Sequence, residues 1–265
     1  MSIDPSAHVH PMSVIEKGAV IGANCVIGPF ACVGPDVVLK PGVELKSHAV
    51  VTGWTEIGEG TIVHSFAVVG GVPQDLKFKG ERTRLIVGRR CSIREGATLN
   101  TGTEGGGGLT RIGDDCLLMT GAHVGHDAIL GDRVILANQV AIAGHCHLGD
   151  DVIVGGLSGV HQFVRIGRGA IIGAVTMVTN DVLPHGLVQG PRGELDGLNL
   201  VGLKRRGVDR AEIIALRNAY DALAHGEGPF MERARSLAQT TESPLVREVV
   251  EFILGASDRS FLTPH

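Results

Sequence analysis

Aliphatic residues recur at every sixth position along most of the chain. One run extends from Val9 to Val69, a second from Val87 to Leu99 and a third from Ile112 to Val178. A helical face would need spacings of three and four, so the period of six predicts short strands joined by tight turns. Three hexapeptides would form one coil, and stacked coils bury a continuous core. We therefore predict a mainly β protein in which residues 1–192 form a parallel β-helix of between eight and nine coils.

Two interruptions break this repeat, near residues 70–84 and 100–111. The first separates Val69 from Val87 by three whole hexapeptides, so the phase survives and a distorted coil with a protruding loop is expected there. The second shifts the phase by one position and contains four consecutive glycines at 105–108, which indicate a flexible loop. Loops on a rigid solenoid often carry function, and solvated insertions without function are equally common.

The last part of the chain, residues 193–265, carries helical signals in place of the repeat. Asp209 followed by Glu212 is a capping-box pattern at the start of a helix. Ser243 and Pro244 fit the N-cap and the first position of a further helix. We therefore predict a small α-helical C-terminal domain over residues 193–265.

Composition and charge narrow the class of protein. Glycine is abundant at 39 residues and aromatic residues make up only 3% of the chain, which suits a thin aliphatic prism. The net charge of −4 argues against a nucleic-acid-binding protein. The N-terminus lacks the basic and apolar regions of a signal peptide, and no apolar segment is long enough to span a membrane. The five cysteines form no CxxC pair, and we expect free thiols in a cytoplasmic protein.

A column of polar residues interrupts the aliphatic pattern in the third run. Positions one coil apart differ by three hexapeptides, which aligns His126 with Gly144 and with Gln162. Neighbouring coils are separated by about 4.8 Å, so these residues stack along one edge of the prism. The polar residues of this edge are His126, Asp127, Gly144, His145, His161 and Gln162.

Two alternatives for the role of this column remain open. It could be an ordinary solvated edge. It could also be a zinc site, because the γ-class carbonic anhydrases share this type of fold and bind zinc through three histidines. The zinc interpretation leaves the helical segment and the loop at 73–80 without a role, so we expect neither a metal nor a cofactor.

Several segments together resemble one enzyme family over nearly the whole chain. The matching segments are Gly121-Ala122-His123-Val124-Gly125-His126-Asp127, Leu136-Ala137-Asn138, Ala143-Gly144-His145, Val160-His161-Gln162-Phe163, Gln74-Asp75-Leu76-Lys77 and Gly202-Leu203-Lys204-Arg205-Arg206-Gly207. They resemble the UDP-N-acetylglucosamine O-acyltransferases, hexapeptide-repeat enzymes of the first step of lipid A biosynthesis. The resemblance implies a left-handed β-helix, although right-handed crossovers are the general rule for parallel strands.

The resemblance also implies a reaction and the residues that carry it. The family transfers an (R)-3-hydroxyacyl group from acyl carrier protein to the 3-hydroxyl of UDP-N-acetylglucosamine. By position, His126 would be the general base, and Asp127 would orient it. The backbone N–H of Gly144 would stabilise the oxyanion. No covalent enzyme intermediate is required.

Further positions would bind the substrates, and basic residues would attract the acidic carrier protein. The substrate-binding residues implied by the resemblance are Gln74, Asp75, Lys77, His123, His145, His161, Gln162, Asn199, Arg205 and Arg206. The basic residues near the end of the coil are Arg165, Arg168, Lys204, Arg205, Arg206, Arg210 and Arg217. A net-negative enzyme needs such a local basic patch to bind an acidic partner.

Ala174 stands where relatives that take long acyl chains have glycine, so it would act as an acyl-chain ruler. It lies eight hexapeptides beyond His126, which is not a whole number of coils, so it falls on a different edge of the prism. It can line the same groove only if two subunits face each other. That supports the homotrimer of the family, with each site between neighbours.

Two departures from the family pattern leave the acceptor open. The family commonly has His-Arg-Gly-Thr where this chain has Asn100-Thr101-Gly102-Thr103, and often has Glu where this chain has Val201. Some relatives prefer a 3-amino sugar and form an amide. Other functions that remain are acetyl transfer from acetyl-CoA, a zinc hydratase and a non-catalytic β-helix.

Overall fold

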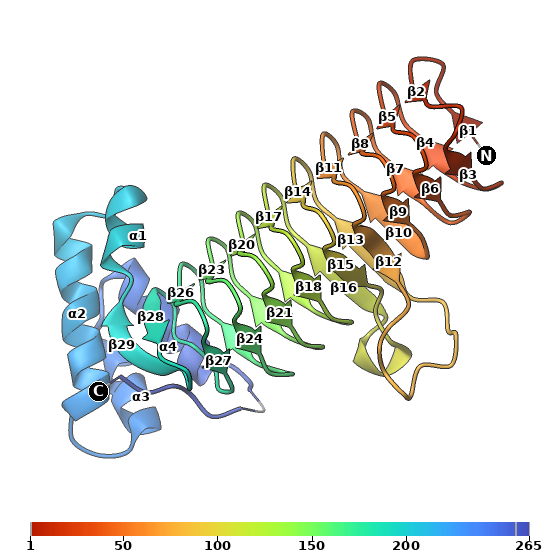
Figure 1. Cartoon of the computed structure of the whole chain (residues 1–265). Helices are drawn as coiled ribbons and strands as arrows, with labels where there is room; N and C mark the ends of the chain where they lie inside the picture. Colours follow the sequence, from red (N-terminus) through yellow and green to blue (C-terminus); the bar gives the residue numbers. More distant parts are fainter. Residues whose placement is uncertain (1, 258, 265) are drawn as a thin grey trace.

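The computed structural model describes residues 2–257 and 259–264, and its main body is a left-handed parallel β-helix (Figure 1). Very short strands form three sheets of nine, eleven and nine strands, one on each face of the prism. Strands three apart in sequence pair in parallel, so each turn of the chain adds one strand to each sheet. The described part of the prism thus contains nine complete coils, close to the number that the repeat predicts.

The first and third sheets are purely parallel. The first sheet contains β1 (Ser2–Ile3), β4 (Val20–Ile21), β7 (Val38–Leu39), β10 (Trp54–Ile57), β13 (Arg84–Val87), β16 (Leu109–Ile112), β19 (Ile129–Leu130), β22 (His147–Leu148) and β25 (Arg165–Ile166). The third sheet contains β3 (Val14–Ile15), β6 (Cys32–Val33), β9 (Val50–Val51), β12 (Val68–Gly71), β15 (Thr98–Asn100), β18 (His123–Val124), β21 (Ala141–Ile142), β24 (Gly159–Val160) and β27 (Met177–Val178).

The second sheet continues past the repeat. It contains β2 (His8–Val9), β5 (Val26–Ile27), β8 (Glu44–Leu45), β11 (Ile62–Val63), β14 (Ser92–Ile93), β17 (Leu117–Leu118), β20 (Ile135–Leu136), β23 (Ile153–Val154), β26 (Ile171–Ile172), β28 (Gly186–Gln189) and β29 (Glu194–Leu198). Strand β29 pairs with β28 in the antiparallel sense. The sheet therefore runs to Leu198, a little beyond the boundary at 192 that the sequence suggests.

The aliphatic residue of each hexapeptide points inward and stacks on its equivalent in the next coil. Leu39, Ile57 and Val87 are successive partners in the first sheet, and each is buried. Such a ladder removes a continuous strip of apolar surface from water, at about 25 cal/mol for each Å² buried. The core therefore runs the whole length of the prism as a thin column.

Both interruptions of the repeat are loops at one corner of the prism. Strand β12, with Val69, ends on one face, and β13, with Val87, begins on the next face, where all four of its residues pair in register with β10. The coil is therefore regular on both sides of the first interruption. The interruption is a loop of residues 72–83 outside the prism, without the distorted coil expected beside it. The second, at 101–108, includes a 3₁₀ turn η1 (Glu104–Gly106) and leaves from the same corner.

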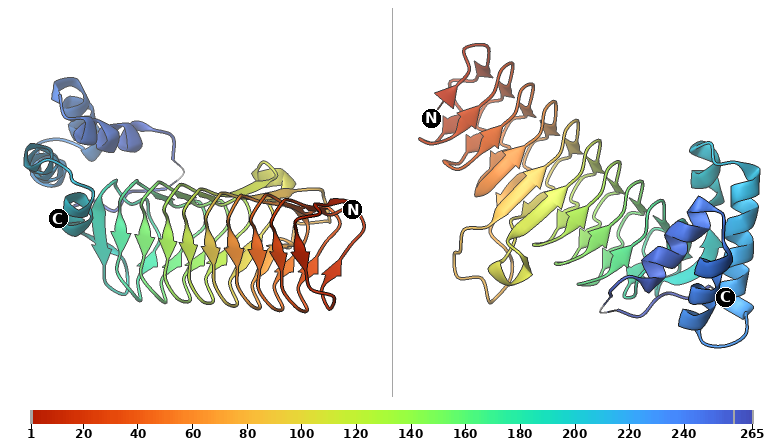
Figure 2. Two further views of the ribbon diagram at one scale, coloured as in Figure 1. Left: turned by 90° about the horizontal axis from the view of Figure 1, so that it is seen from above. Right: turned by 180° about the vertical axis from the view of Figure 1, so that it is seen from behind.

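Helices cover the C-terminal end of the prism (Figure 2). They are α1 (Leu200–Arg205), α2 (Arg210–His225), α3 (Phe230–Thr240) and α4 (Pro244–Leu254). Asp209 caps α2 and Ser243 caps α4, as the sequence predicts. Glu212 does not close the capping box, because its carboxylate accepts a hydrogen bond from the Ser243 hydroxyl at 2.6 Å. None of the helices in the described parts of the chain is long and apolar enough to cross a membrane.

A small ionic cluster joins the helices to the β-helix. Arg168 and His185 of the prism both contact the carboxylate of Glu248 on α4. Burial alone would raise the pKa of Glu248, but the hydrogen bonds from His185 and Arg168 outweigh it and lower the pKa to about 2. The cluster therefore stabilises the docked helix as long as the carboxylate is charged.

We predict that Glu248→Gln lowers the free energy of unfolding near neutral pH by about 1–3 kcal/mol. The stabilisation is present above the ordinary glutamate pKa of 4.5 and is lost as the pH falls toward the lowered value of about 2. Urea denaturation of wild type and variant across this range should show the two curves converging at low pH. Glu251→Gln, an exposed carboxylate on the same helix, is the control and should change little.

Candidate active site

The polar residues that the repeat aligns lie in the turns between the third and the first sheet, the same corner from which both loops leave. We call this the loop corner: the turns from the third sheet to the first, with the loops 72–83 and 101–108. The His145 N–H donates to the His126 carbonyl at 3.0 Å, and the Phe163 N–H donates to the Gly144 carbonyl at 3.2 Å. The stacking predicted from the spacing of one coil is therefore confirmed.

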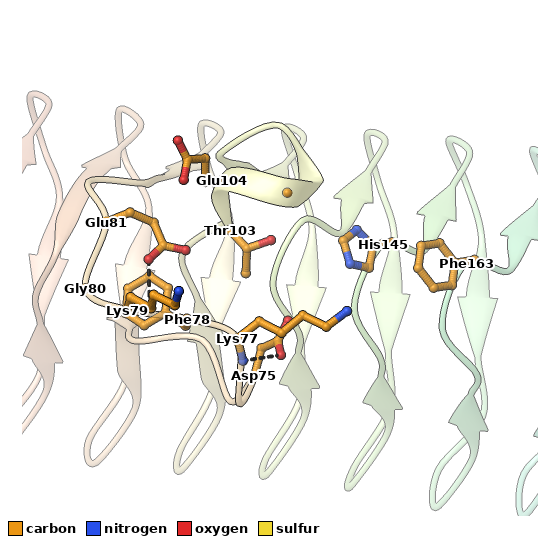
Figure 3. A pocket seen from close by; sticks show the side chains of 11 residues that line it. Asp75, Lys77, Phe78, Lys79, Gly80, Glu81, Thr103, Glu104, His145 and Phe163 are labelled. Atoms are coloured by element: carbon orange, nitrogen blue, oxygen red, sulfur yellow. Dashed lines mark hydrogen bonds between the residues drawn. The ribbon is translucent and has the colours of Figure 1, made fainter.

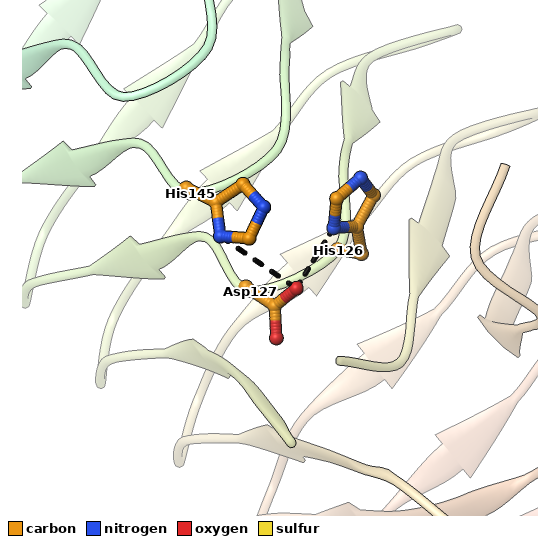
Figure 4. Close-up of side chains that lie close together, drawn as sticks. All are labelled: His126, Asp127 and His145. Atoms are coloured by element: carbon orange, nitrogen blue, oxygen red, sulfur yellow. Dashed lines mark hydrogen bonds and ion pairs between the residues drawn. The ribbon is translucent and has the colours of Figure 1, made fainter. Parts of the chain in front are cut away.

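His126 and Asp127 form a buried pair (Figure 4). The His126 Nδ1 lies 2.8 Å from the Asp127 Oδ2, and the side chains are only 7% and 1% exposed. Asp127 occupies the left-handed position of its turn, with φ of 59°, and its N–H donates to the Thr110 hydroxyl at 2.7 Å. Because the carboxylate accepts from Nδ1, the Nε2 of His126 is free to receive a proton.

Gly144 brings its backbone against the His126 ring. A Cβ built on Gly144 would lie 2.6 Å from the ring Cε1 and 2.7 Å from Nε2. Any side chain at this position would therefore displace the imidazole. Only a glycine lets the backbone approach the ring this closely.

Two grooves flank this pair at the loop corner. A groove of about 380 Å³ is lined by Gln74, His123, His126, Gly144, His161 and Gln162 among others. A neighbouring groove of about 650 Å³ is lined by Asp75, Lys77, Thr103, Glu104, His145 and Phe163 among others (Figure 3). The structure therefore gathers most of the predicted site residues within one chain.

The histidines of the grooves are held in distinct environments. Burial lowers the pKa of His123 and of His145, so both rings are neutral near neutral pH and act as hydrogen-bonding groups. The His123 Nδ1 lies 2.8 Å from the Thr98 hydroxyl. The His145 ring stacks on Phe163 at 4.5 Å between centroids, an aromatic partner that the repeat did not single out.

Arg259 reaches the same corner from the end of the chain. After α4 the chain returns to the β-helix, where Phe261 bridges to Asp181. The Arg259 Nη2 lies 2.7 Å from the His161 Nδ1, closer than the Gln162 carbonyl at 3.4 Å. A guanidinium only donates, so Nδ1 accepts and the ring proton of His161 sits on Nε2. No periodic pattern in the sequence marked Arg259.

Asn100 and Thr103 are further residues of the corner whose contacts only the structure reveals. The Asn100 amide donates to the Val72 carbonyl at 3.0 Å, and its buried Oδ1 has no hydrogen-bond partner among the described residues. Thr103 donates to Asp127 through its backbone and its hydroxyl. The sequence marked both only as part of a departure from the family pattern.

Four predicted residues are not brought to His126 within one chain. Asn199 is buried and caps α1, accepting from the Gly202 N–H at 2.9 Å, and its amide donates to the Gly169 carbonyl at 3.0 Å. Arg206 packs near His185, and Arg205 is exposed on α1. Ala174 follows β26 and so lies on the corner between the second and third sheets, as its spacing predicts.

The predicted basic patch is smaller than the sequence suggests. Arg165 donates to Asp181 at 2.7 Å, and Arg168 is held by Glu248, so neither charge is available to a partner. Lys204, Arg210 and Arg217 are exposed around a groove of about 530 Å³ between α1 and α2. The patch is smaller because Asp181 and Glu248 neutralise two of the arginines. The spacing of residues along the chain does not reveal these pairs.

One cluster has the composition of a metal site. Ligand atoms of His126, Asp127 and His145 all lie within 4.8 Å of one another. Both oxygens of Asp127, however, already accept hydrogen bonds from Thr103, at 2.8 Å and 2.6 Å. A metal would have to compete with these bonds for the carboxylate, so the geometry favours a proton-transfer pair.

Comparisons with known proteins identify relatives of the whole chain. The family description "Udp N-acetylglucosamine O-acyltransferase; Domain 2" matches residues 181–262, and "Bacterial transferase hexapeptide (six repeats)" matches residues 109–144. A Paracoccus denitrificans protein named acyl-[acyl-carrier-protein]–UDP-N-acetylglucosamine O-acyltransferase is 65% identical over 204 residues, 77% of each chain. Its namesake from Agrobacterium fabrum is 46% identical and covers 100% of this chain and 98% of its own. The solved UDP-N-acetylglucosamine acyltransferase from Campylobacter jejuni is 38% identical, with a TM-score of 0.89 and 100% of both chains covered.

Proposed function

Since the chain belongs to the UDP-N-acetylglucosamine O-acyltransferase family and is an acyltransferase, we propose that it acylates the 3-position of UDP-N-acetylglucosamine. The donor is an (R)-3-hydroxyacyl chain on acyl carrier protein, and the reaction is the first step of lipid A biosynthesis. The observation that carries this proposal is the buried His126–Asp127 pair, which opens onto a groove beside the Gly144 backbone.

In this mechanism His126 is the general base. Its Nε2 takes the proton of the sugar 3-hydroxyl as that oxygen attacks the thioester carbonyl carbon. Asp127 accepts the Nδ1–H and favours the imidazolium that forms. The Gly144 N–H donates to the oxyanion of the tetrahedral intermediate. When the C–S bond breaks, the imidazolium returns the proton to the carrier's thiolate.

The other groove residues hold the substrates. Gln74, Asp75 and Lys77 of the loop 72–83 face the sugar nucleotide, together with the neutral imidazoles of His123 and His145. His161, with its proton on Nε2, and Gln162 donate hydrogen bonds deeper along the same groove. Arg205 and Arg206 hold the nucleotide diphosphate from a neighbouring subunit. Asn199, which caps α1, fixes the helix that presents them.

A homotrimer with sites between neighbours accounts for the residues that one chain leaves apart. The corner that carries Ala174 also presents Leu157 and Val175, which are 67% and 60% exposed. Large exposed apolar side chains in a row are typical of a surface that another subunit covers. Packing this corner against the loop corner of a neighbour would place Ala174 on the acyl-chain side of the groove.

Replacing His126 with alanine is expected to lower kcat by at least about 10²–10⁴-fold, the usual contribution of a general base. Turnover of hydroxyacyl carrier proteins with UDP-N-acetylglucosamine, and with its 3-amino analogue, provides the measurement. His147→Ala, an exposed histidine on the first sheet, is the control and should keep full activity. Undiminished turnover in His126→Ala, or stoichiometric zinc with hydratase activity in the wild type, would contradict the proposal.

Carrier-protein binding is assigned to the basic groove between α1 and α2. Reversing Arg210 and Arg217 to glutamate should raise KM for the carrier-bound donor about tenfold or more at low salt, while kcat changes little. The effect should shrink at high ionic strength, because exposed charges are screened. Arg247→Glu, outside this groove, serves as the control. An unchanged KM would exclude this groove as the docking surface.

Chain-length selection is assigned to Ala174. Ala174→Gly removes one methyl group from the wall of the acyl groove, so longer hydroxyacyl donors should be accepted better. A competition between donors that differ by two carbons measures the shift, expected to be about 10-fold or less. The same length preference in variant and wild type would refute the ruler.

A further inference from the structure

The proposed mechanism leaves the glycine-rich loop 101–108 without a role. This loop folds directly over Asp127, which lies more than a full coil further along the sequence. Its hydrogen bonds to the catalytic pair all go to one functional group, the carboxylate that faces His126. That location is what a device for positioning the catalytic pair would require.

Thr103 contacts both oxygens of this carboxylate. Its backbone N–H donates to the Asp127 Oδ1 at 2.8 Å, and its hydroxyl donates to Oδ2 at 2.6 Å. Oδ2 is the same oxygen that lies 2.8 Å from the His126 Nδ1. The two donors of Thr103 fix both the position and the rotation of the carboxyl plane of Asp127. Because this carboxylate in turn contacts the His126 Nδ1, Thr103 determines the direction in which the imidazole is held.

The loop also orients the Thr103 hydroxyl. Its Oγ accepts a hydrogen bond from the Gly106 N–H at 3.2 Å as the cap of η1. With that lone pair engaged, the hydroxyl proton is directed at Asp127. Thr103 itself is only 6% exposed, so water does not compete for these bonds.

The glycines of the loop are explained by the same carboxylate. A Cβ on Gly106 would lie 2.2 Å from the Asp127 Cγ, and one on Gly102 would lie 2.8 Å from Oδ1. Gly107 and Gly108 have φ of 95° and 76°, in the left-handed region that favours glycine. A Cβ on Gly105, in contrast, would meet nothing within 4 Å. The close approach of Asp127 therefore requires glycine at positions 102 and 106, and the backbone conformation favours glycine at positions 107 and 108.

We propose that Thr103 is the positioning residue of the catalytic pair, and that the loop 101–108 is the clamp that holds it on Asp127. Thr103 lines the larger groove, but its hydroxyl is engaged by Asp127 and by the Gly106 N–H. It acts through Asp127, by keeping the carboxylate oriented so that the His126 Nε2 points at the acceptor hydroxyl. This inference rests on the proposed function, in which His126 is the base.

The first experiment removes the hydroxyl alone. Thr103→Val should lower kcat about 10- to 100-fold with little change in KM for either substrate, and Thr103→Ser should recover activity to within about threefold. Thr55→Val is the control, because Thr55 is also buried and its hydroxyl donates only to the Thr52 carbonyl. Thermal melts establish that each variant is folded.

A pH profile separates positioning from a merely structural role. Without the Thr103 hydroxyl, Oδ2 has one donor fewer and attracts the His126 imidazolium more strongly. The acid limb of kcat/KM should therefore move to higher pH in Thr103→Val and return in Thr103→Ser. The other titratable groups that face His126, namely His123 and His145, are the same in all variants.

The second experiment tests the clamp with two neighbouring glycines. Gly106→Ala should reduce kcat as Thr103→Val does, because the new methyl group displaces the Asp127 carboxylate. Gly105→Ala adds the same methyl group beside the groove and away from Asp127, so it should lower kcat less than Gly106→Ala does. If His126→Ala is inactive while Thr103→Val and Gly106→Ala match the wild type, the positioning role is wrong and the proposed function stands. If His126→Ala is active, the proposed function itself fails.

Discussion

The in-register stacking of aliphatic side chains from coil to coil is the interaction on which the rest of the structure depends. Each hexapeptide contributes an inward aliphatic strand residue, such as Leu39, that rests on its equivalent in the next coil, and most add a second buried residue, such as Val37. The stack fixes the register of all three sheets, because a shift of one position would turn the aliphatic row outward. It therefore also fixes which turns lie above one another. The alignment of His126 with Gly144 and Gln162 is a consequence of packing in the core.

Both loops can leave the prism because they leave at a corner. The faces are tied by parallel hydrogen bonds, whereas a corner has no partner strand to disrupt, so additional residues there leave the register intact. The same corner carries the His126–Asp127 pair. The rigid prism thus supplies the spacing of the proposed catalytic groups, and the loops bury them and provide the walls of the grooves. Burial by the loop 101–108 is what leaves the Asp127 carboxylate 1% exposed.

The C-terminal end combines the prism with groups from distant parts of the chain. Glu248 ties α4 to Arg168 and His185, and the segment after α4 returns Arg259 to His161. Pairing with Glu248 and Asp181 neutralises two of the arginines that looked free in the sequence. The cations that remain exposed lie at the groove between α1 and α2, which is the surface proposed to bind an acidic carrier protein.

The sequence by itself determined the β-helix, the coil length, the helical C-terminal segment and the column around His126, because these follow from a strict local period and from capping residues. The matched motifs named His126, Asp127 and Gly144 together with most of the groove. Only the tertiary structure decided that the first interruption contains no distorted coil beside its loop and that Thr103 holds Asp127. It also showed that Arg259 reaches His161 and that Arg165 and Arg168 are paired. These contacts join residues far apart in the chain through loops of no fixed period, so no spacing rule predicts them. The hydrogen bonds that the loops make are decided by where the folded prism places their partners.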